Sequence, residues 1–171
     1  MADDWIRYVD REMVADLIKR AQRSLRGRLN LNLHPKLDDP IQRLLNAGSP
    51  GSYVRPHRHR PGIWELVLTL RGHIDALVFD DAGRITRRLP LKAGGEGIIQ
   101  NPGGVWHSFV FVEPGSVAFE LKPGPYEASL DKEFASWAPL EGEVGASDYA
   151  DWMATASVGD RCENDRSRGS G

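Results

Sequence analysis

The chain has 171 residues, of which 40% are hydrophobic and 27% are charged, and its formal net charge is −2. This size and balance suit one globular domain and exclude a dominant electrostatic attraction to nucleic acids or anionic membranes. No apolar run approaches the roughly 20 residues that span a bilayer, and residues 1–8 hold Asp3 and Asp4 but no apolar signal segment. We therefore expect a cytoplasmic protein with no nucleic-acid or membrane partner. Cys162 is the only cysteine, so no intrachain disulfide can form, and its polar surroundings predict an exposed thiol.

The first predicted element is a helix within an N-terminal segment, residues 1–27. Asp10 can cap its start and Gly27 can end it. Its apolar residues recur at helical spacing: Val14, Leu17, Ile18, Ala21 and Leu25. We expect this amphipathic helix to pack on the outside of the main body.

A strictly alternating segment follows. Its polar residues are Arg28, Asn30, Asn32 and His34, and leucines occupy the positions between them. A period of two predicts an extended strand with one polar and one apolar face. On this pattern alone, the simplest interpretation is an edge strand whose polar side faces water.

The central part of the chain alternates short apolar segments with turn residues. Residues 41–47 fit either a strand or a short helix, and further strands are predicted at 63–70, 74–79, 85–91, 108–111 and 117–121. Residues 80–83 form a predicted hairpin connection. Many short strands without alternating helices predict a mainly β sandwich or small barrel, assigned to residues 28–143.

The C-terminal part carries weaker signals. Ser147 is predicted to cap a short helix, within residues 144–158, that bears Tyr149, Trp152 and Met153. Residues 159–171 are polar and are predicted to form a disordered tail. Neither a repeat nor a second domain is predicted.

Three histidines and one glutamate form the candidate metal site. His57 and His59 stand two residues apart in an extended segment, so both imidazoles project from the same face. Glu65 follows across a turn, and His107 lies on a later strand that a barrel could bring opposite. This ligand set suits one divalent ion such as Zn, Fe, Mn, Ni or Co, with positions left for water or substrate.

The spacing of these residues resembles the two sequence motifs of the cupin superfamily. The first motif corresponds to Gly51, His57-Arg58-His59, Glu65 and Gly72, and the second corresponds to Pro102-Gly103-Gly104-Val105-Trp106-His107. The gap before Glu65 is a residue or two longer than usual, Phe111 replaces the expected asparagine, and the leading glycine of the second motif is displaced. The resemblance implies a cupin double-stranded β-helix (jelly-roll) barrel with an N-terminal helix and a short C-terminal helix. It also implies a homodimer.

Segments outside the motifs narrow the resemblance to the WbuC-type cupins, over about residues 5–143. These segments are the alternating run 28–34, Asp39-Pro40, residues 55–59 and residues 131–139. WbuC-type proteins are encoded among polysaccharide or O-antigen genes in some bacteria. The resemblance therefore implies polysaccharide precursor metabolism, and it favours substrate binding by the polar side chains Arg28, Asn30, Asn32 and His34.

Four further residues each allow a functional and a structural interpretation. Arg55 shares the parity of His57, so it is expected to point inward and either clamp an anionic substrate or pair with a buried acid. Glu96 is either a catalytic acid or a turn residue, and Trp106 is either core or a platform for a sugar ring. His73 is expected to be a surface histidine rather than a ligand.

Together these expectations describe a metal-dependent enzyme acting on a small polar or anionic molecule, a class that includes sugar-related compounds. Isomerisation, epimerisation, hydrolysis and dioxygen chemistry all stay open, because a site with three histidines and one glutamate is compatible with each. The alternative is a module that binds a small molecule through the metal without turning it over.

Overall fold

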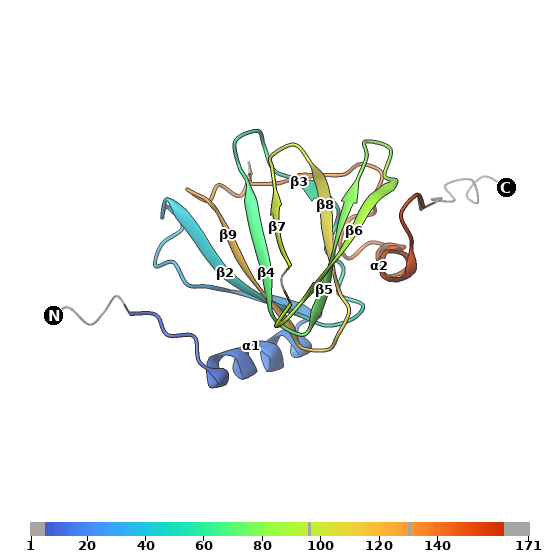
Figure 1. Ribbon diagram of the computed structural model, residues 1–171. Coiled ribbons are helices and arrows are strands. Elements are labelled where there is room, and N and C mark those ends of the chain that lie inside the picture. The colour runs from blue at the N-terminus through green and yellow to red at the C-terminus, as the bar shows by residue number, and fades with distance from the viewer. Residues whose placement is uncertain (1–5, 96, 130, 163–171) are drawn as a thin grey trace.

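The computed structural model describes residues 6–95, 97–129 and 131–162 as two five-stranded antiparallel sheets that face each other (Figure 1). One sheet has the strand order β1-β2-β9-β4-β7, and the other has the order β10-β3-β8-β5-β6. The strands of the first sheet are β1 (Arg28–Asn32), β2 (Ile41–Gly48), β9 (Ser116–Pro123), β4 (Glu65–Arg71) and β7 (Ile98–Asn101). Those of the second are β10 (Glu133–Phe134), β3 (His57–Arg58), β8 (Trp106–Phe111), β5 (His73–Phe79) and β6 (Ile85–Lys92).

Helix α1 (Arg11–Arg23) packs on the outer face of the first sheet, as its amphipathic pattern predicts. The Asp10 side chain accepts a hydrogen bond from the Met13 amide at 2.8 Å, which confirms the predicted cap. Leu17 and Ala21 are buried against outward-facing residues of β2 and β9. The helix ends before Leu25, which is exposed rather than part of the apolar stripe.

The alternating segment forms β1 at the edge of this sheet, and residues 41–47 lie in strand β2 rather than in a helix. Leu29 and Leu31 lie on the outer face, packed in the cluster under α1. Because side chains alternate across a strand, Arg28, Asn30 and Asn32 lie on the inner face, the one turned toward the second sheet. The polar side of β1 is therefore part of the space between the sheets, rather than a plain solvent face.

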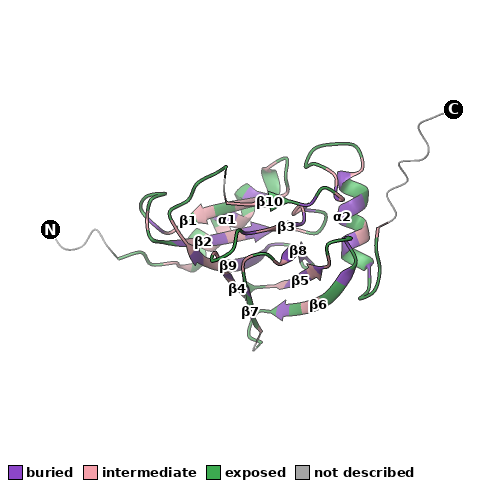
Figure 2. Ribbon diagram, turned by 90° about the horizontal axis from the view of Figure 1, so that it is seen from above, coloured by how far each residue is buried: buried purple, intermediate pink, exposed green. Residues whose placement is uncertain are grey.

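Helix α2 (Ala146–Thr155) covers the outer face of the second sheet (Figure 2). The prediction that Ser147 caps this helix is wrong, because the N-cap is Gly145, in a left-handed conformation with φ 91°. Glycine adopts that conformation without steric cost, so the turn into the helix needs no capping side chain. At the other end, the Arg88 guanidinium donates hydrogen bonds to the carbonyls of Met153, Ala154 and Ala156.

Part of the predicted C-terminal tail is paired with the body of the protein. Ile85 donates its backbone N–H to the Asp160 carbonyl at 2.9 Å, and Arg84 forms a β-bridge with Arg161. Cys162 is half-buried against the cluster beneath α2, so the expectation of an exposed thiol is wrong, and burial raises the pKa of that thiol. The rest of the tail, residues 163–171, lies outside the described residues. No helix in the described ranges is long and apolar enough to cross a membrane.

Candidate metal centre

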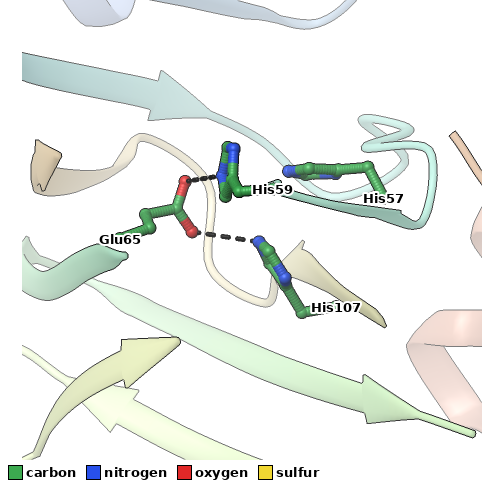
Figure 3. Close-up of side chains that lie close together, drawn as sticks. All are labelled: His57, His59, Glu65 and His107. Carbon is green, nitrogen blue, oxygen red and sulfur yellow. Dashed lines mark hydrogen bonds and ion pairs between the residues drawn. The ribbon is translucent and has the colours of Figure 1, made fainter. Parts of the chain in front are cut away.

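The four predicted metal ligands converge in one buried cluster between the sheets (Figure 3). Each of His57, His59, Glu65 and His107 offers one ligand atom, and these atoms all lie within 4.8 Å of one another. His57 on β3 is the direct register partner of His107 on β8, and Glu65 opens β4 in the opposite sheet. All four side chains are only 1% exposed. The barrel thus unites residues that are up to 50 positions apart in the chain.

Each imidazole of the cluster has its Nδ1 atom turned to a backbone carbonyl. The distances are 2.9 Å from His57 to the Arg55 carbonyl, 2.7 Å from His59 to that of Asp131, and 2.9 Å from His107 to that of Val105. A carbonyl only accepts, so each Nδ1 carries a proton, and Nε2 is the ring atom that each imidazole turns to the cluster for binding a metal. This is the tautomer that a metal-ligating histidine requires.

The Glu65 carboxylate faces two of those nitrogen atoms. Its oxygens lie 3.4 Å from His59 Nε2 and 3.1 Å from His107 Nε2, and Asn101 on β7 donates a hydrogen bond to it at 3.2 Å. The Nε2 atoms of His57 and His107 are buried without a hydrogen-bond partner among the described residues. Lone pairs that face a carboxylate repel one another unless a cation lies between them. The donor set therefore fits a metal ion, and this cluster could hold one.

Electrostatics keep the cluster in a form that can bind a metal. Burial by itself would raise the pKa of Glu65, but the neighbouring imidazoles of His107 and His59 and the positive charge of Lys132 outweigh burial and hold that pKa well below its ordinary value. The pKa of His57 is also held well below its ordinary value, first by burial and then by the positive charge of Lys132. At neutral pH, Glu65 is thus ionised and His57 is neutral.

This burial predicts that the metal-free protein loses stability in mild acid. Below about pH 6.5, the ordinary histidine value, the unfolded chain takes up a proton on His57 that the folded chain excludes. The free energy of unfolding should therefore fall with decreasing pH, by at most about 1.4 kcal/mol per pH unit for this one group. Glu65 lowers the free energy of unfolding further only below about pH 4.5, because the pKa of Glu65 in the folded protein lies below that ordinary value.

Urea unfolding of chelator-treated protein between about pH 7.5 and 5.5 measures this slope. His57→Gln, which removes the titrating group, is the matched control and should flatten the curve. An equal slope in the variant would show that another group is responsible.

Backbone packing at the second motif holds the two motifs together. The Gly104 amide donates to the His59 carbonyl at 2.8 Å. A Cβ atom added to Gly103 would collide with the backbone of Arg60 and Pro61. Glycine at 103 therefore permits the close approach that places His107 beside His59.

The structure places Arg55 beside the cluster rather than in it. Its Nη2 donates to the Ala135 carbonyl at 2.7 Å, and its guanidinium lies 5.3 Å from the centre of the Phe134 ring. Its Nε is buried with no hydrogen-bond partner in the described ranges. The other predicted catalytic residue, Glu96, lies outside the described residues.

Trp106 points away from the cluster. It precedes His107 on β8, so its ring lies on the opposite, outer face, where it joins the cluster beneath α2. Its Nε1 donates to Asp81 at 3.0 Å, and the Arg58 guanidinium covers the ring at 4.3 Å from its centre. The structure thus gives Trp106 a packing role and does not bring it to the metal ligands.

The polar residues of the alternating segment are divided among different contacts. Arg28 is held by Glu141 at 2.9 Å, and Asn30 donates to Asn32 at 2.9 Å. His34 is buried and its Nδ1 interacts with the backbone of Arg43, away from the cluster. His73 is paired with Asp75 at 2.7 Å and is not a member of the cluster.

Sequence reasoning missed the residues that support the ligands. Asn101 binds Glu65 from the neighbouring strand, and Asp131 holds His59 through its carbonyl and Lys122 through its carboxylate. Asn101 directly precedes the second motif, but nothing in its type or spacing distinguishes it from a turn residue. Only the register of β4 with β7, which pairs Glu65 with Asn101, gives it this role.

Comparisons with known proteins agree with this architecture. Oxalate oxidase in complex with the substrate analogue glycolate matches with a TM-score of 0.55 at 13% identity, over 90% of this chain and 83% of its own. CapF from Staphylococcus aureus, a capsular polysaccharide assembling protein, matches with a TM-score of 0.54 at 16% identity, over 65% of this chain and 30% of its own. The chain has the cupin fold. This confirms the predicted jelly-roll barrel with its two helices.

A weaker structural match and a family model cover shorter parts of the chain. The cupin domain of an XRE family transcriptional regulator from Enterobacter cloacae matches at 16% identity with a TM-score of 0.45, over 58% of this chain and 99% of its own. A family model described as a domain of unknown function, DUF6016, matches residues 9–91, which include His57, His59 and Glu65 but not His107. No curated protein sequence matches the chain.

Proposed function

We propose that this cupin binds one divalent metal ion through His57, His59, Glu65 and His107 and acts as a metal-dependent enzyme on a small polar or anionic molecule. The observation that carries the proposal is the convergence of three Nε2 lone pairs and one carboxylate, with every Nδ1 proton engaged elsewhere. A bound ion of this kind supplies Lewis-acid polarisation of substrate oxygens or activation of water. The chain contributes the ligands, their orientation and a site shielded from bulk water.

We place the protein in polysaccharide precursor metabolism as a WbuC-type cupin, on the resemblance of residues 28–34, 55–59 and 131–139. The fold neighbour CapF, described as a capsular polysaccharide assembling protein, is in keeping with that direction. In this proposal the protein is a cytoplasmic homodimer. Arg55 and Glu96 remain proposed catalytic residues, and Arg28, Asn30 and Asn32 remain proposed substrate contacts.

The second candidate is a non-catalytic module in which the metal holds a small molecule. The complete burial of the four ligand side chains favours it, because a substrate must displace part of the covering chain to reach the ion. The cover includes residues 131–134, since Asp131 binds His59 and the Phe134 ring lies 6.1 Å from that of His57. An enzyme with this geometry must open at each turnover.

Metal analysis of the purified protein tests the shared part of both candidates and should give about one divalent ion per chain. A screen of nucleotide sugars and 2-oxo acids then separates them. An enzyme forms product, and a chelator abolishes that activity. A binding module instead shows metal-dependent thermal stabilisation by a compound that is recovered unchanged. A protein that binds no metal would contradict both.

A further inference from the structure

The inner face of the first sheet carries a continuous line of polar side chains, which we call the polar row: Asn30, Asn32, Asn46, Glu120 and Lys122. Asn30 on β1 is paired in register with Asn46 on β2, which is paired with Ala118 on β9. Ala118 packs in the apolar cluster between the sheets, so Glu120 and Lys122, two and four residues later on the strand, share its inward face.

The polar row runs from exposed side chains on β1 to buried side chains on β9. Asn30 and Asn32 are exposed, Asn46 and Glu120 are half-buried, and the Lys122 side chain is 5% exposed. Lys122 Nζ lies 2.7 and 2.8 Å from the two carboxylate oxygens of Asp131, whose carbonyl accepts the His59 Nδ1 proton. Burial and the negative charge of Glu65 both raise the pKa of Glu120, as expected for carboxylates that lie near each other.

The stability of the fold does not require polar side chains at the positions of the polar row. Apolar residues on the inner face would pack as Val67 and Ala118 do, whereas charged groups lose hydration when they are buried. One carboxylate oxygen in the polar row can also accept a further hydrogen bond. Asn46 donates to Glu120 Oε2 at 2.7 Å, but Glu120 Oε1 lies 3.9 Å from Lys122 Nζ, beyond hydrogen-bond distance. That oxygen can accept a bond from a ligand.

We propose that the polar row binds the hydroxyl groups of a polyhydroxylated ligand whose anionic end lies at the metal. Amides donate and accept, and the carboxylate accepts, so together they match hydroxyl groups, which do both. Lys122 already has Asp131 as its partner, so the row offers no free cation for a second anionic group. This inference rests on the proposed metal site and adds the class of substrate.

The test compares gluconate with hexanoate, which has the same carbon number and carboxylate but no hydroxyl groups. Isothermal titration of the metal-loaded protein should give a lower dissociation constant for gluconate, by about tenfold or more. Glu120→Gln and Asn46→Ala should each weaken gluconate binding by about tenfold and leave hexanoate binding unchanged. Glu113→Gln, in the exposed turn between β8 and β9, is the matched control and should alter neither.

Metal content, measured for every variant after titration, separates failure of the metal site from failure of the polar row as a hydroxyl-binding site. If the wild-type protein holds no metal, the proposed function fails and the inference fails with it. If metal is bound but gluconate binds no better than hexanoate, or neither compound binds, the polar row is not a hydroxyl site and the inference alone is overturned. It is also overturned if Glu120→Gln and Asn46→Ala keep the metal, remain folded by circular dichroism and bind gluconate as tightly as the wild type.

Discussion

A variant carrying both His57→Ala and His59→Ala is expected to hold almost no metal, against about one ion per chain in the wild type. The substitutions remove two of four ligands and leave only His107 and Glu65, which are 3.1 Å apart. Loss of a single supporting partner of a metal ligand already costs about 10–100-fold in affinity. Removing two ligands should therefore lower affinity by well over 100-fold, a loss that elemental analysis after dialysis will detect.

His73→Ala is the matched control for this double variant. His73 is also a histidine in the second sheet, but it is paired with Asp75 and lies outside the cluster. The control should retain full metal content. Retention of full metal content by the double variant would disprove the proposed ligand set, whatever activity the protein has.

Lys122→Met should lower the free energy of unfolding by about 3–5 kcal/mol, the usual cost of removing one partner from a buried ion pair. Burial by itself would lower the pKa of Lys122, but the charges of Glu120 and Asp131 outweigh it and raise that pKa, so the side chain is charged at neutral pH. Methionine fills a similar volume and leaves both carboxylates without this cation. Urea unfolding at neutral pH measures the difference.

Lys92→Met, at the exposed end of β6, is the control and should change stability by no more than about 0.5 kcal/mol. Lys122→Met has a second expected effect, because Asp131 orients His59 through its carbonyl and Lys122 holds the Asp131 carboxylate. Metal affinity should fall by about 10–100-fold. Equal stability of the two lysine variants would show that the Lys122–Asp131 pair contributes little to the folded state.

Local sequence patterns were sufficient for most of the secondary structure. The helical spacing of Leu17 and Ala21 and the alternation from Arg28 onward correspond to α1 and β1, because both periodicities follow directly from backbone geometry. The short strands β7 and β10 were not predicted, whereas β3 lies in the extended segment expected around His57 and His59. Two to four residues carry too little pattern, and these strands exist because a neighbouring strand offers them hydrogen bonds.

The candidate metal site could be predicted because its residues keep the spacing of two known motifs. His57, His59, Glu65 and His107 were expected to meet, and the structure brings them together. Its surroundings were predicted less well. Trp106 was considered as a sugar platform, but strand alternation turns it to the outer face of β8, where Arg58 covers it. That result follows from the predicted inward direction of His107, because successive residues on a strand point to opposite faces.

The sequence by itself determined the mainly β character of the chain, its first helix and the identity of four donor residues. These are properties of local periodicity and of motif spacing, which the chain carries before it folds. Only the tertiary structure decided that Asn101 supports Glu65 and that Glu120 and Lys122 share the inner face of the first sheet. Those roles depend on strand register and on which face of each strand turns inward. Both are decided when distant segments pair, because a shift of one residue would move every side chain to the other face.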